Sequence, residues 1–294
     1  MATEFPLNPD SIRTVAVLGA GTIGNGIAHV FARSGYGVVL CDIEQRLLDR
    51  ALETVSKNLD REIRKGTVPA PEKTTILGRI AAVTKIEVIS AADFVVEAVP
   101  EQLDLKRNVL GHADRLLRAE VIIATNTSSI SITTLAAATN RPDRCIGMHF
   151  MNPVPVMPLV EVIRALQTSD DTFDTITKLC EKLQKKPVAV TDSPGFVSNR
   201  VLMPLINEAA FCVMEGVAAP ESVDAVMKLG MNHPMGPLEL ADFIGLDVCL
   251  DIMGALFSGF GDSKFRPCPL LKKMVSAGWL GKKSGRGFYV YSGK

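Results

Sequence analysis

A strand, a glycine-rich turn and a helix follow one another in VAVLGAGTIGNGIA, the segment that constrains the fold most strongly. The short apolar run at 14–18 predicts a buried strand, and the apolar spacing over 22–34 predicts a helix. A second apolar run at 38–41 predicts the next strand. A strand, a crossover helix and a second strand require parallel pairing with a right-handed connection. The N-terminal region therefore predicts a βαβ unit.

The first turn of this unit is rich in glycine, and Gly19, Gly21 and Gly24 form the motif GxGxxG. They permit a tight turn, close approach of a pyrophosphate and close packing of helix on strand. The helix begins at Thr22 and Ile23, whose backbone N–H groups lie at a helix N-terminus and can bind phosphate. The spacing alone also occurs by chance in other loops. Here strand, turn and helix are in register, so we predict dinucleotide binding.

Asp42 ends the second strand, 18 residues after Gly24. A carboxylate at this place can accept hydrogen bonds from the adenosine ribose hydroxyls and would repel a 2′-phosphate. The expected cofactor is therefore NAD rather than NADP, although Arg46 would soften the discrimination. Asp42 also suits a different role, as N-cap of the helix that begins near Ile43 and Glu44.

Strand and helix signals continue to alternate up to residue 192. We expect further strands at 80–83, 94–99, 121–125, 145–149, 159–163 and 188–190, and helices at 44–65, 103–117, 132–138 and 172–183. Alternation on this scale is typical of a doubly wound α/β sheet. Residues 1–192 are therefore expected to form a Rossmann-type, mostly parallel sheet domain that binds NAD.

Strand signals stop after the segment Asp192-Ser193-Pro194-Gly195, which carries turn residues. The remaining chain has helical spacing at 197–215, 220–229, 241–257 and 270–277. Residues 193–294 are therefore expected to form a second, all-helical C-terminal domain.

Charge and composition exclude several classes of partner. Lys plus Arg and Asp plus Glu both count 32, so no net field favours nucleic acid or an anionic membrane. No apolar stretch reaches the roughly 20 residues of a membrane span, and MATEFPLNPDSIR lacks the basic start and apolar core of a signal peptide. The six cysteines have no CxxC spacing, so we expect reduced thiols and no metal site. A cytoplasmic protein is expected.

His149 ends one apolar run, and Glu161 stands twelve positions later inside another. Glu161 alternates with Leu159 and Ile163 on one face of its strand, where an unpaired carboxylate would be costly. A carboxylate on one imidazole nitrogen would fix the tautomer and leave the other nitrogen to take a proton. From the residues alone, the pair is either a general base with its orienting carboxylate or a structural ion pair. The other histidines are interpreted as structural or exposed: His29, His112 and His233.

Ligands of a doubly wound sheet bind beyond the carboxyl ends of its strands. Four segments fall at such ends and are expected to converge on one cleft: GAGTIG, EAVPE at 97–101, NTSS at 126–129 and HFMNP at 149–153.

Seven blocks along the whole chain together resemble the L-3-hydroxyacyl-CoA dehydrogenase family, and most of all its bacterial 3-hydroxybutyryl-CoA branch. They are GAGTIG, VVEAVPE, NTSS, GMHFMNPVPVMPLVE, DSPGFVSNR, HPMGPLELADFIGLD and GKKSGRGFY. The resemblance implies that His149 and Glu161 form a catalytic dyad, and that Ser128 and Asn199 hydrogen-bond the substrate around the reacting carbon. It also implies NAD contacts at the nicotinamide end from Glu101, Lys106, Ser128, Asn152 and Lys283. The loop that carries Lys283 also suits an ordinary solvated turn.

The reaction implied is oxidation of a short-chain L-3-hydroxyacyl-CoA to the 3-ketoacyl-CoA, and its reverse, with His149 as acid and base. Basic side chains of the second helix either contact CoA or form a solvated face: Lys57, Arg61, Arg64 and Lys65. The family further implies antiparallel last strands, an interdomain cleft for acyl-CoA and a homodimer paired through the C-terminal domain. Two alternatives stay open, a dehydrogenase of a free hydroxy or sugar acid such as gulonate, and a non-catalytic NAD-binding or structural protein.

Overall fold

The computed structural model describes residues 9–291, which divide into two compact units at Asp192 and Ser193. The ends of the chain at 1–8 and 292–294 lie outside the described residues, and so does most of the segment considered as a signal peptide.

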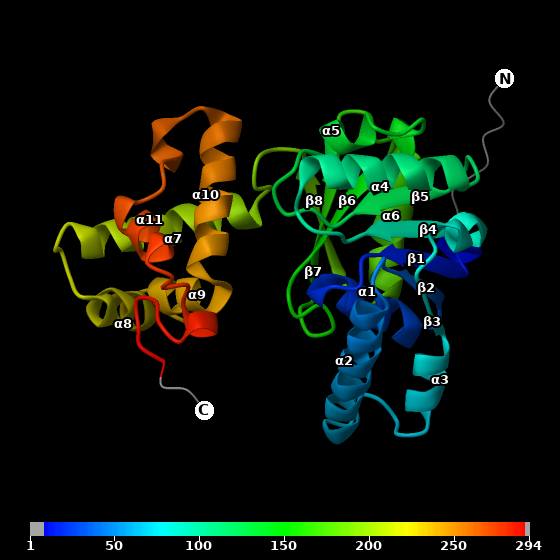
Figure 1. Cartoon of the computed structure of the whole chain (residues 1–294), viewed down its shortest axis with the longest axis horizontal. Helices are drawn as coiled ribbons and strands as arrows, with labels where there is room; N and C mark the ends of the chain where they lie inside the picture. The colour runs from blue at the N-terminus through cyan, green and yellow to red at the C-terminus, as the bar shows by residue number, and fades with distance from the viewer. Residues whose placement is uncertain (1–8, 292–294) are drawn as a thin grey trace. The chain divides into compact units, whose positions relative to one another are not determined.

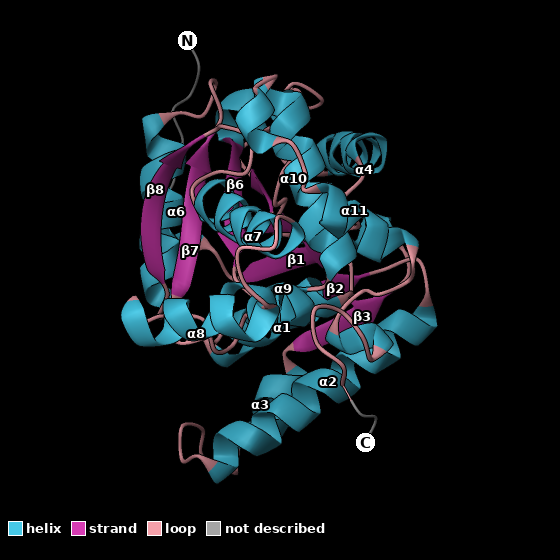
Figure 2. Cartoon of the chain, turned by 90° about the vertical axis from the view of Figure 1, so that its left-hand side faces the viewer, coloured by secondary structure: helices cyan, strands magenta, loops and turns pink. Residues whose placement is uncertain are grey.

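A single sheet of eight strands forms the first unit, in the order β3-β2-β1-β4-β5-β6-β7-β8 (Figures 1 and 2). The strands are β1 Thr14–Leu18, β2 Gly37–Cys41, β3 Ile80–Val83, β4 Phe94–Glu97, β5 Ile122–Thr125, β6 Cys145–Phe150, β7 Leu159–Arg164 and β8 Lys186–Thr191. The strand order reverses at β1, which lies between β2 and β4. Crevices at such a reversal are the usual ligand sites of this fold.

All neighbouring strands are parallel except β6 and β7. Only residues 151–158 join these two strands, and a parallel pair needs a crossover of a dozen residues or more. The short connection therefore forces antiparallel pairing, and β7 and β8 run against the rest of the sheet. The expected Rossmann-type, mostly parallel sheet is confirmed.

Helices cover both faces of the sheet. They are α1 Thr22–Arg33, α2 Gln45–Arg64, α3 Glu72–Gly78, α4 Leu103–Leu116, α5 Ile132–Ala136 and α6 Asp170–Lys182, with 3-10 turns η1 Pro9–Ser11, η2 Ile86–Ala91 and η3 Pro142–Arg144. Strand alternation separates the two layers: Ile122 and Ala124 belong to the core cluster with α1 and α6, whereas Ile123 faces Leu110 of α4 and Ile132 of α5. The short α3 and the 3-10 turns were not predicted.

The second helix, α2, shows how its sequence selects the buried face. Leu48, Ala51, Val55 and Leu59 are its buried residues, and they recur every three or four positions. Most of the side chains between them are charged or polar and are exposed or half-buried, so the helix is amphipathic.

The second unit contains only helices and short turns, and every strand of the described chain lies in the first unit (Figure 2). Its helices are α7 Ser198–Met214, α8 Pro220–Gly230, α9 Pro237–Ile244, α10 Leu246–Phe260 and α11 Pro269–Ser276, with 3-10 turns η4 Ser263–Phe265 and η5 Lys282–Ser284. The prediction of one helix at 241–257 is wrong in its bounds, because the helical region is interrupted at Gly245, between α9 and α10. This residue has φ of 109°, outside the helical region, so it ends one helix and begins the next.

Two buried aspartates hold the last described residues of the second unit in place. Asp224 accepts hydrogen bonds from the backbone N–H groups of Leu238 and Glu239 at the start of α9 and from the Tyr289 hydroxyl, at 2.7–2.9 Å. Asp242 accepts from the Phe288 and Tyr289 N–H groups and from the Tyr291 hydroxyl. These bonds fix the C-terminal segment against α8 and α9.

Trp279, the single tryptophan of the chain, follows α11 in the same unit. Its ring lies 3.6 Å from the guanidinium carbon of Arg286, a cation–π contact that orders the turn before the C-terminal segment.

Three further features concern residues 9–291 as a whole. None of their helices is long and apolar enough to cross a membrane. No group of three or more His, Cys, Asp or Glu side chains in this range could hold a metal ion. All six cysteines are unbonded, and five of them are buried.

Candidate active site

The glycine turn between β1 and α1 has the geometry that its spacing predicted. A Cβ on Gly19 would lie 2.6 Å from the carbonyl oxygen of Ala98, and one on Gly24 would lie 1.8 Å from the carbonyl oxygen of Gly19. Both positions therefore exclude a side chain. A Cβ on Gly21 would meet no atom within 4 Å, so this glycine faces open space. The turn thus packs tightly on its inner side and leaves room for a ligand on its outer side.

The helix that follows presents its N-terminus at the same place. Gly21 is the N-cap of α1, and no side chain caps the helix. The first intrahelical bond runs from Asn25 N–H to the Gly21 carbonyl, so the N–H groups of Thr22 and Ile23 precede the hydrogen-bond ladder. Such an end attracts phosphate through both its N–H groups and its dipole.

Asp42 joins the glycine turn to the end of β2. Its Oδ2 accepts a hydrogen bond from Ala20 N–H at 2.7 Å, and its Oδ1 accepts from Glu44 N–H at 3.2 Å. Because α2 begins at Gln45 with Glu44 as its N-cap, the alternative of Asp42 as helix cap is wrong. Arg46 is largely exposed and pairs with Glu44 instead, at 3.4 Å.

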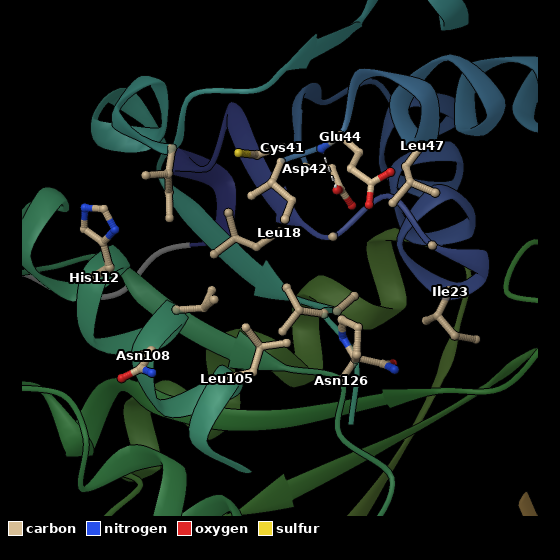
Figure 3. Close-up of a pocket in the computed structure, with 18 of the residues that line it drawn as sticks. Leu18, Ile23, Cys41, Asp42, Glu44, Leu47, Leu105, Asn108, His112 and Asn126 are labelled. Atoms are coloured by element: carbon tan, nitrogen blue, oxygen red, sulfur yellow. Dashed lines mark hydrogen bonds between the residues drawn. The ribbon is translucent and has the colours of Figure 1, made fainter. Parts of the chain in front are cut away.

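A pocket of about 870 Å³ opens beside the glycine turn (Figure 3). Asp42 and Glu44 line it at the end of β2, and Asn126 and Ser128 line it at the end of β5. Leu18, at the end of β1, lies between these polar ends. The pocket thus runs across the carboxyl ends of the central strands, at the reversal of strand order.

Two polar side chains of α4 also line this pocket, and the sequence did not point to them. Asn108 and His112 both lie at the same end of the cavity (Figure 3). His112 was expected to be structural or exposed. With Leu105 and Val109 these residues form one face of α4 at the i, i+3, i+4, i+7 spacing. That spacing is the signal that could have found them, once the helix was known to face the cavity.

His149 and Glu161 are direct cross-strand partners on β6 and β7. The Nδ1 of His149 lies 2.8 Å from Glu161 Oε2, and both side chains are buried. A carboxylate at Nδ1 favours the tautomer that carries its proton there, and so sets Nε2 as the nitrogen available for proton exchange. The short connection between β6 and β7 therefore produces the pairing that the sequence suggested.

Glu101 accepts several hydrogen bonds from the loop after β5. Its Oε1 accepts hydrogen bonds from the Thr127 hydroxyl at 2.6 Å and from the backbone N–H groups of Ser128 and Ser129, each at 2.9 Å. Burial by itself would raise the pKa of Glu101, but the nearby Lys106 ammonium and these hydrogen bonds outweigh it and hold the pKa below its usual value. Glu101 and Ser128 thus lie at one wall of the pocket as a connected group.

Lys106 stands behind this wall rather than on it. Its side chain is 1% exposed, and its ammonium lies 2.7 Å from Glu97 Oε1 and 3.4 Å from Glu101 Oε2. The residues that line the pocket do not include it. Any effect of Lys106 on a ligand therefore passes through Glu101.

Asn152 lines a second, smaller cavity of about 340 Å³ beside the glycine turn. It precedes a cis peptide bond to Pro153. Arg50, Thr54 and Asn58 of α2 line the same cavity, so polar groups of α2 face it. Among the basic residues noted on α2, Lys57 pairs with Glu53, Arg61 donates to Asn58, and Lys65 lines a third cavity.

The remaining predicted residues belong to the second unit. Asn199 lies in the first turn of α7 and is buried. Lys283 lies in η5, where its ammonium is 2.6 Å from the Asp247 carboxylate of α10. This ion pair gives the GKKSG loop a fixed partner.

Comparison with known proteins agrees with this geometry. Residues 14–193 match the family model "3-hydroxyacyl-CoA dehydrogenase, NAD binding domain", and residues 195–291 match "3-hydroxyacyl-CoA dehydrogenase, C-terminal domain". A Bacillus subtilis protein named "Probable 3-hydroxybutyryl-CoA dehydrogenase" is 54% identical over 96% of this chain and 99% of its own. A Bradyrhizobium diazoefficiens 3-hydroxybutyryl-CoA dehydrogenase is 51% identical over 96% of each chain.

Solved structures show the same likeness. The crystal structure of (S)-3-hydroxybutyryl-CoA dehydrogenase from Ralstonia eutropha superposes with a TM-score of 0.93 at 52% identity, covering 96% of this chain and 100% of that one. Sheet, glycine turn and carboxylate define an NAD-dependent dehydrogenase of Rossmann type, and the residues around the pocket fit that cofactor. The chain belongs to the 3-hydroxyacyl-CoA dehydrogenase family.

Proposed function

We propose that the protein interconverts short-chain L-3-hydroxyacyl-CoA, 3-hydroxybutyryl-CoA above all, and the corresponding 3-ketoacyl-CoA. The observation that carries the proposal is the buried pair of His149 and Glu161. His149 lies near the C-terminal end of β6, and its Nδ1 is 2.8 Å from Glu161 Oε2 on the neighbouring strand β7. Relatives more than 50% identical over nearly the whole chain carry the 3-hydroxybutyryl-CoA name, which supports the choice of substrate.

In this mechanism His149 takes the proton from the 3-hydroxyl group through Nε2. NAD, when bound, would supply the acceptor for the hydride that leaves C3. In the reverse direction His149, as imidazolium, protonates the forming alkoxide. Glu161 stabilises that cation through Nδ1, which lowers the free energy of the charged state. Ser128 and Asn199 hydrogen-bond the oxygen on which charge develops.

The geometry of the turn and the pocket supports the cofactor contacts that we propose. Gly19, Gly21, Thr22, Ile23 and Gly24 would hold the pyrophosphate at the glycine turn and the start of α1. Asp42 accepts hydrogen bonds from the ribose hydroxyls of the adenosine. Glu101, Ser128 and Asn152 would hold the nicotinamide end, with Lys106 acting through Glu101. In this proposal Lys283 also contributes to the site from the C-terminal loop.

In this proposal the two domains have different roles. Residues 1–192 hold NAD, and residues 193–294 supply substrate contacts and the surface that pairs two subunits into a homodimer. Acyl-CoA is the small-molecule partner, without nucleic acid or membrane, and the protein acts in the cytoplasm. Balanced charge supports the absence of a polyanion partner.

The test is oxidation of NADH by the purified protein with acetoacetyl-CoA, followed by NADH absorbance. NADPH and acetoacetate lacking CoA are measured beside it. We expect turnover only with NADH and the thioester, because Asp42 disfavours a 2′-phosphate and the substrate is held through CoA. Turnover of free acetoacetate or a sugar acid would support the free-acid alternative. NADH binding without turnover of any substrate would support the non-catalytic one.

A further inference from the structure

A buried chain of charged groups lies beneath the loop that carries Ser128. Glu97 ends β4 and is 0% exposed, and Lys106 of α4 is 1% exposed. Their charged atoms are 2.7 Å apart, and Glu101 Oε2 lies 3.4 Å from the same ammonium. Two carboxylates therefore share one cation, and the sharing is unequal.

Every contact of Glu97 is with the protein interior. Its Oε1 accepts hydrogen bonds from Lys106 Nζ and from Val99 N–H, both at 2.7 Å. Its Oε2 accepts from the Thr125 hydroxyl at 2.6 Å. A fully buried ion pair adds little net stability compared with apolar residues of similar size. The role of this pair is therefore better explained by the groups that it holds in position than by a gain in stability.

Glu101 is the group whose position depends on this pair. Its Oε1 accepts from Ser128 N–H, Ser129 N–H and two hydroxyl groups, so this one oxygen binds three successive residues of the loop. Its Oε2 faces Lys106. If the ammonium moved toward Oε2, the carboxylate would turn, and the bonds from Oε1 to the loop would lengthen.

We propose that Glu97 is a positioning residue: it holds the Lys106 ammonium away from Glu101, so that Glu101 stays directed at the backbone of Ser128 and Ser129. Glu97 itself touches neither cofactor nor substrate. The inference rests on the proposed function in one respect, the placing of the nicotinamide end of the cofactor beside Glu101 and Ser128.

The test compares two ligands of the same pocket in Glu97→Gln. In the proposed function, NADH would contact both the glycine turn with Asp42 and the wall formed by Glu101 and Ser128, whereas ADP-ribose lacks the nicotinamide ring. We expect the Kd for NADH to rise about tenfold, because losing a hydrogen bond to a charged group has an effect of this order. The Kd for ADP-ribose stays within about twofold, since Asp42 and the glycine turn are untouched. Calorimetric titration of both ligands measures this ratio.

Asp114→Asn is the matched control. Asp114 of α4 is, like Glu97, a buried carboxylate. It lies 2.7 Å from the Arg141 guanidinium and also accepts a hydrogen bond from Asn140. It does not line the pocket, so the variant breaks a comparable ion pair away from the pocket. It should lower the melting temperature and leave both Kd values unchanged. Equal weakening of NADH and ADP-ribose by Glu97→Gln, or no weakening of NADH, would overturn the proposal.

A second variant tests the proposal if Glu97→Gln does not fold. Thr125→Val removes one hydrogen bond to Glu97 and keeps all charges, and it should raise the NADH Kd selectively by a smaller factor.

The proposed reaction and the role of Glu97 can fail separately. A wild type that binds NADH but reduces no acetoacetyl-CoA would reject the proposed reaction. The selective loss of NADH affinity in Glu97→Gln would still stand in that case, so the two failures are distinguishable.

Discussion

At the scale of single residues, the contact between His149 and Glu161 follows from strand pairing. The two residues are register partners across β6 and β7, and both side chains point to the same side of the sheet. A shift of one residue in register would send one of them to the opposite face. The pair is therefore fixed by the whole ladder from Ile146 to Phe150, which gives it the rigidity that proton transfer needs.

His149→Gln tests the role of this pair. We expect kcat for acetoacetyl-CoA reduction to fall by a factor of about 10² to 10⁴, because glutamine cannot exchange a proton at this position. The NADH Kd should be nearly unchanged, since the side chain serves the reaction rather than cofactor affinity. Steady-state kinetics and NADH titration measure the two quantities. Full activity in the variant would remove His149 from the mechanism.

At the scale of elements, the six residues from Gly19 to Gly24, at the turn from β1 to α1, combine two demands. Gly19 and Gly24 allow strand, turn and helix to pack without side chains between them. Gly21 leaves its outer side open. The same turn is therefore structural at two positions and available to a ligand at the third.

Two alanine substitutions separate these demands. Gly24→Ala places a Cβ 1.8 Å from the Gly19 carbonyl oxygen, so we expect a loss of stability of more than about 2 kcal/mol from overpacking. Gly21→Ala meets no protein atom within 4 Å and should leave the melting temperature nearly unchanged. It should still weaken NADH at least about tenfold, because the methyl group takes the space of the pyrophosphate. Thermal unfolding and NADH titration of both variants give the comparison, and a destabilised Gly21→Ala with normal affinity would contradict it.

At the scale of the whole molecule, each unit contains buried carboxyl groups, and the pKa values of some of them shift in opposite directions. In the first, burial opposes ionisation of Glu101 and Asp114, but cationic partners and hydrogen bonds lower the pKa of both. In the second, burial raises the pKa of Asp242 despite its hydrogen bonds. A lowered pKa stabilises the fold above the ordinary carboxyl value, and this contribution is lost as pH falls. A raised pKa contributes stability at low pH, and this contribution is lost as pH rises through the folded value.

Acid should therefore weaken the first unit more than the second. As pH falls through the ordinary values of 4.5 for Glu and 3.8 for Asp, Glu101 and Asp114 lose their contribution while that of Asp242 grows. Asp247, whose pKa is lowered by Lys283 against its burial, reduces the difference. Calorimetry at neutral and acid pH, with Trp279 fluorescence to mark the second unit, measures both transitions. An equal downward shift of the Trp279 transition would contradict the expectation.

Most of the fold could be predicted from the sequence because its signals are local. Strand runs, the glycine turn and the amphipathic α2 each depend on a few neighbouring residues. The break at Gly245 was missed because apolar spacing continues across it, and only its φ of 109° separates α9 from α10. The direction of β7 came from the resemblance alone.

The pocket was less predictable than the fold. Gly21 and Asp42 were found because their roles follow from spacing along the chain. His112 was missed, because which face of α4 meets the cavity depends on tertiary packing. The burial of Lys106 behind Glu101 was missed for the same reason: its partner Glu97 lies nine residues earlier on a different element.

The last strand of the sheet has a consequence for how copies of the molecule behave together. In β8 the Lys186 N–H donates to the Pro158 carbonyl, toward β7, so alternation turns the nitrogen of Pro187 to the outer edge. A proline there offers no N–H donor, and the neighbouring Lys186 is exposed. A strand from another molecule would find a missing hydrogen bond and a charge where it tried to pair. The edge of the sheet thus resists intermolecular β-extension, and with it the growth of aggregates at high concentration.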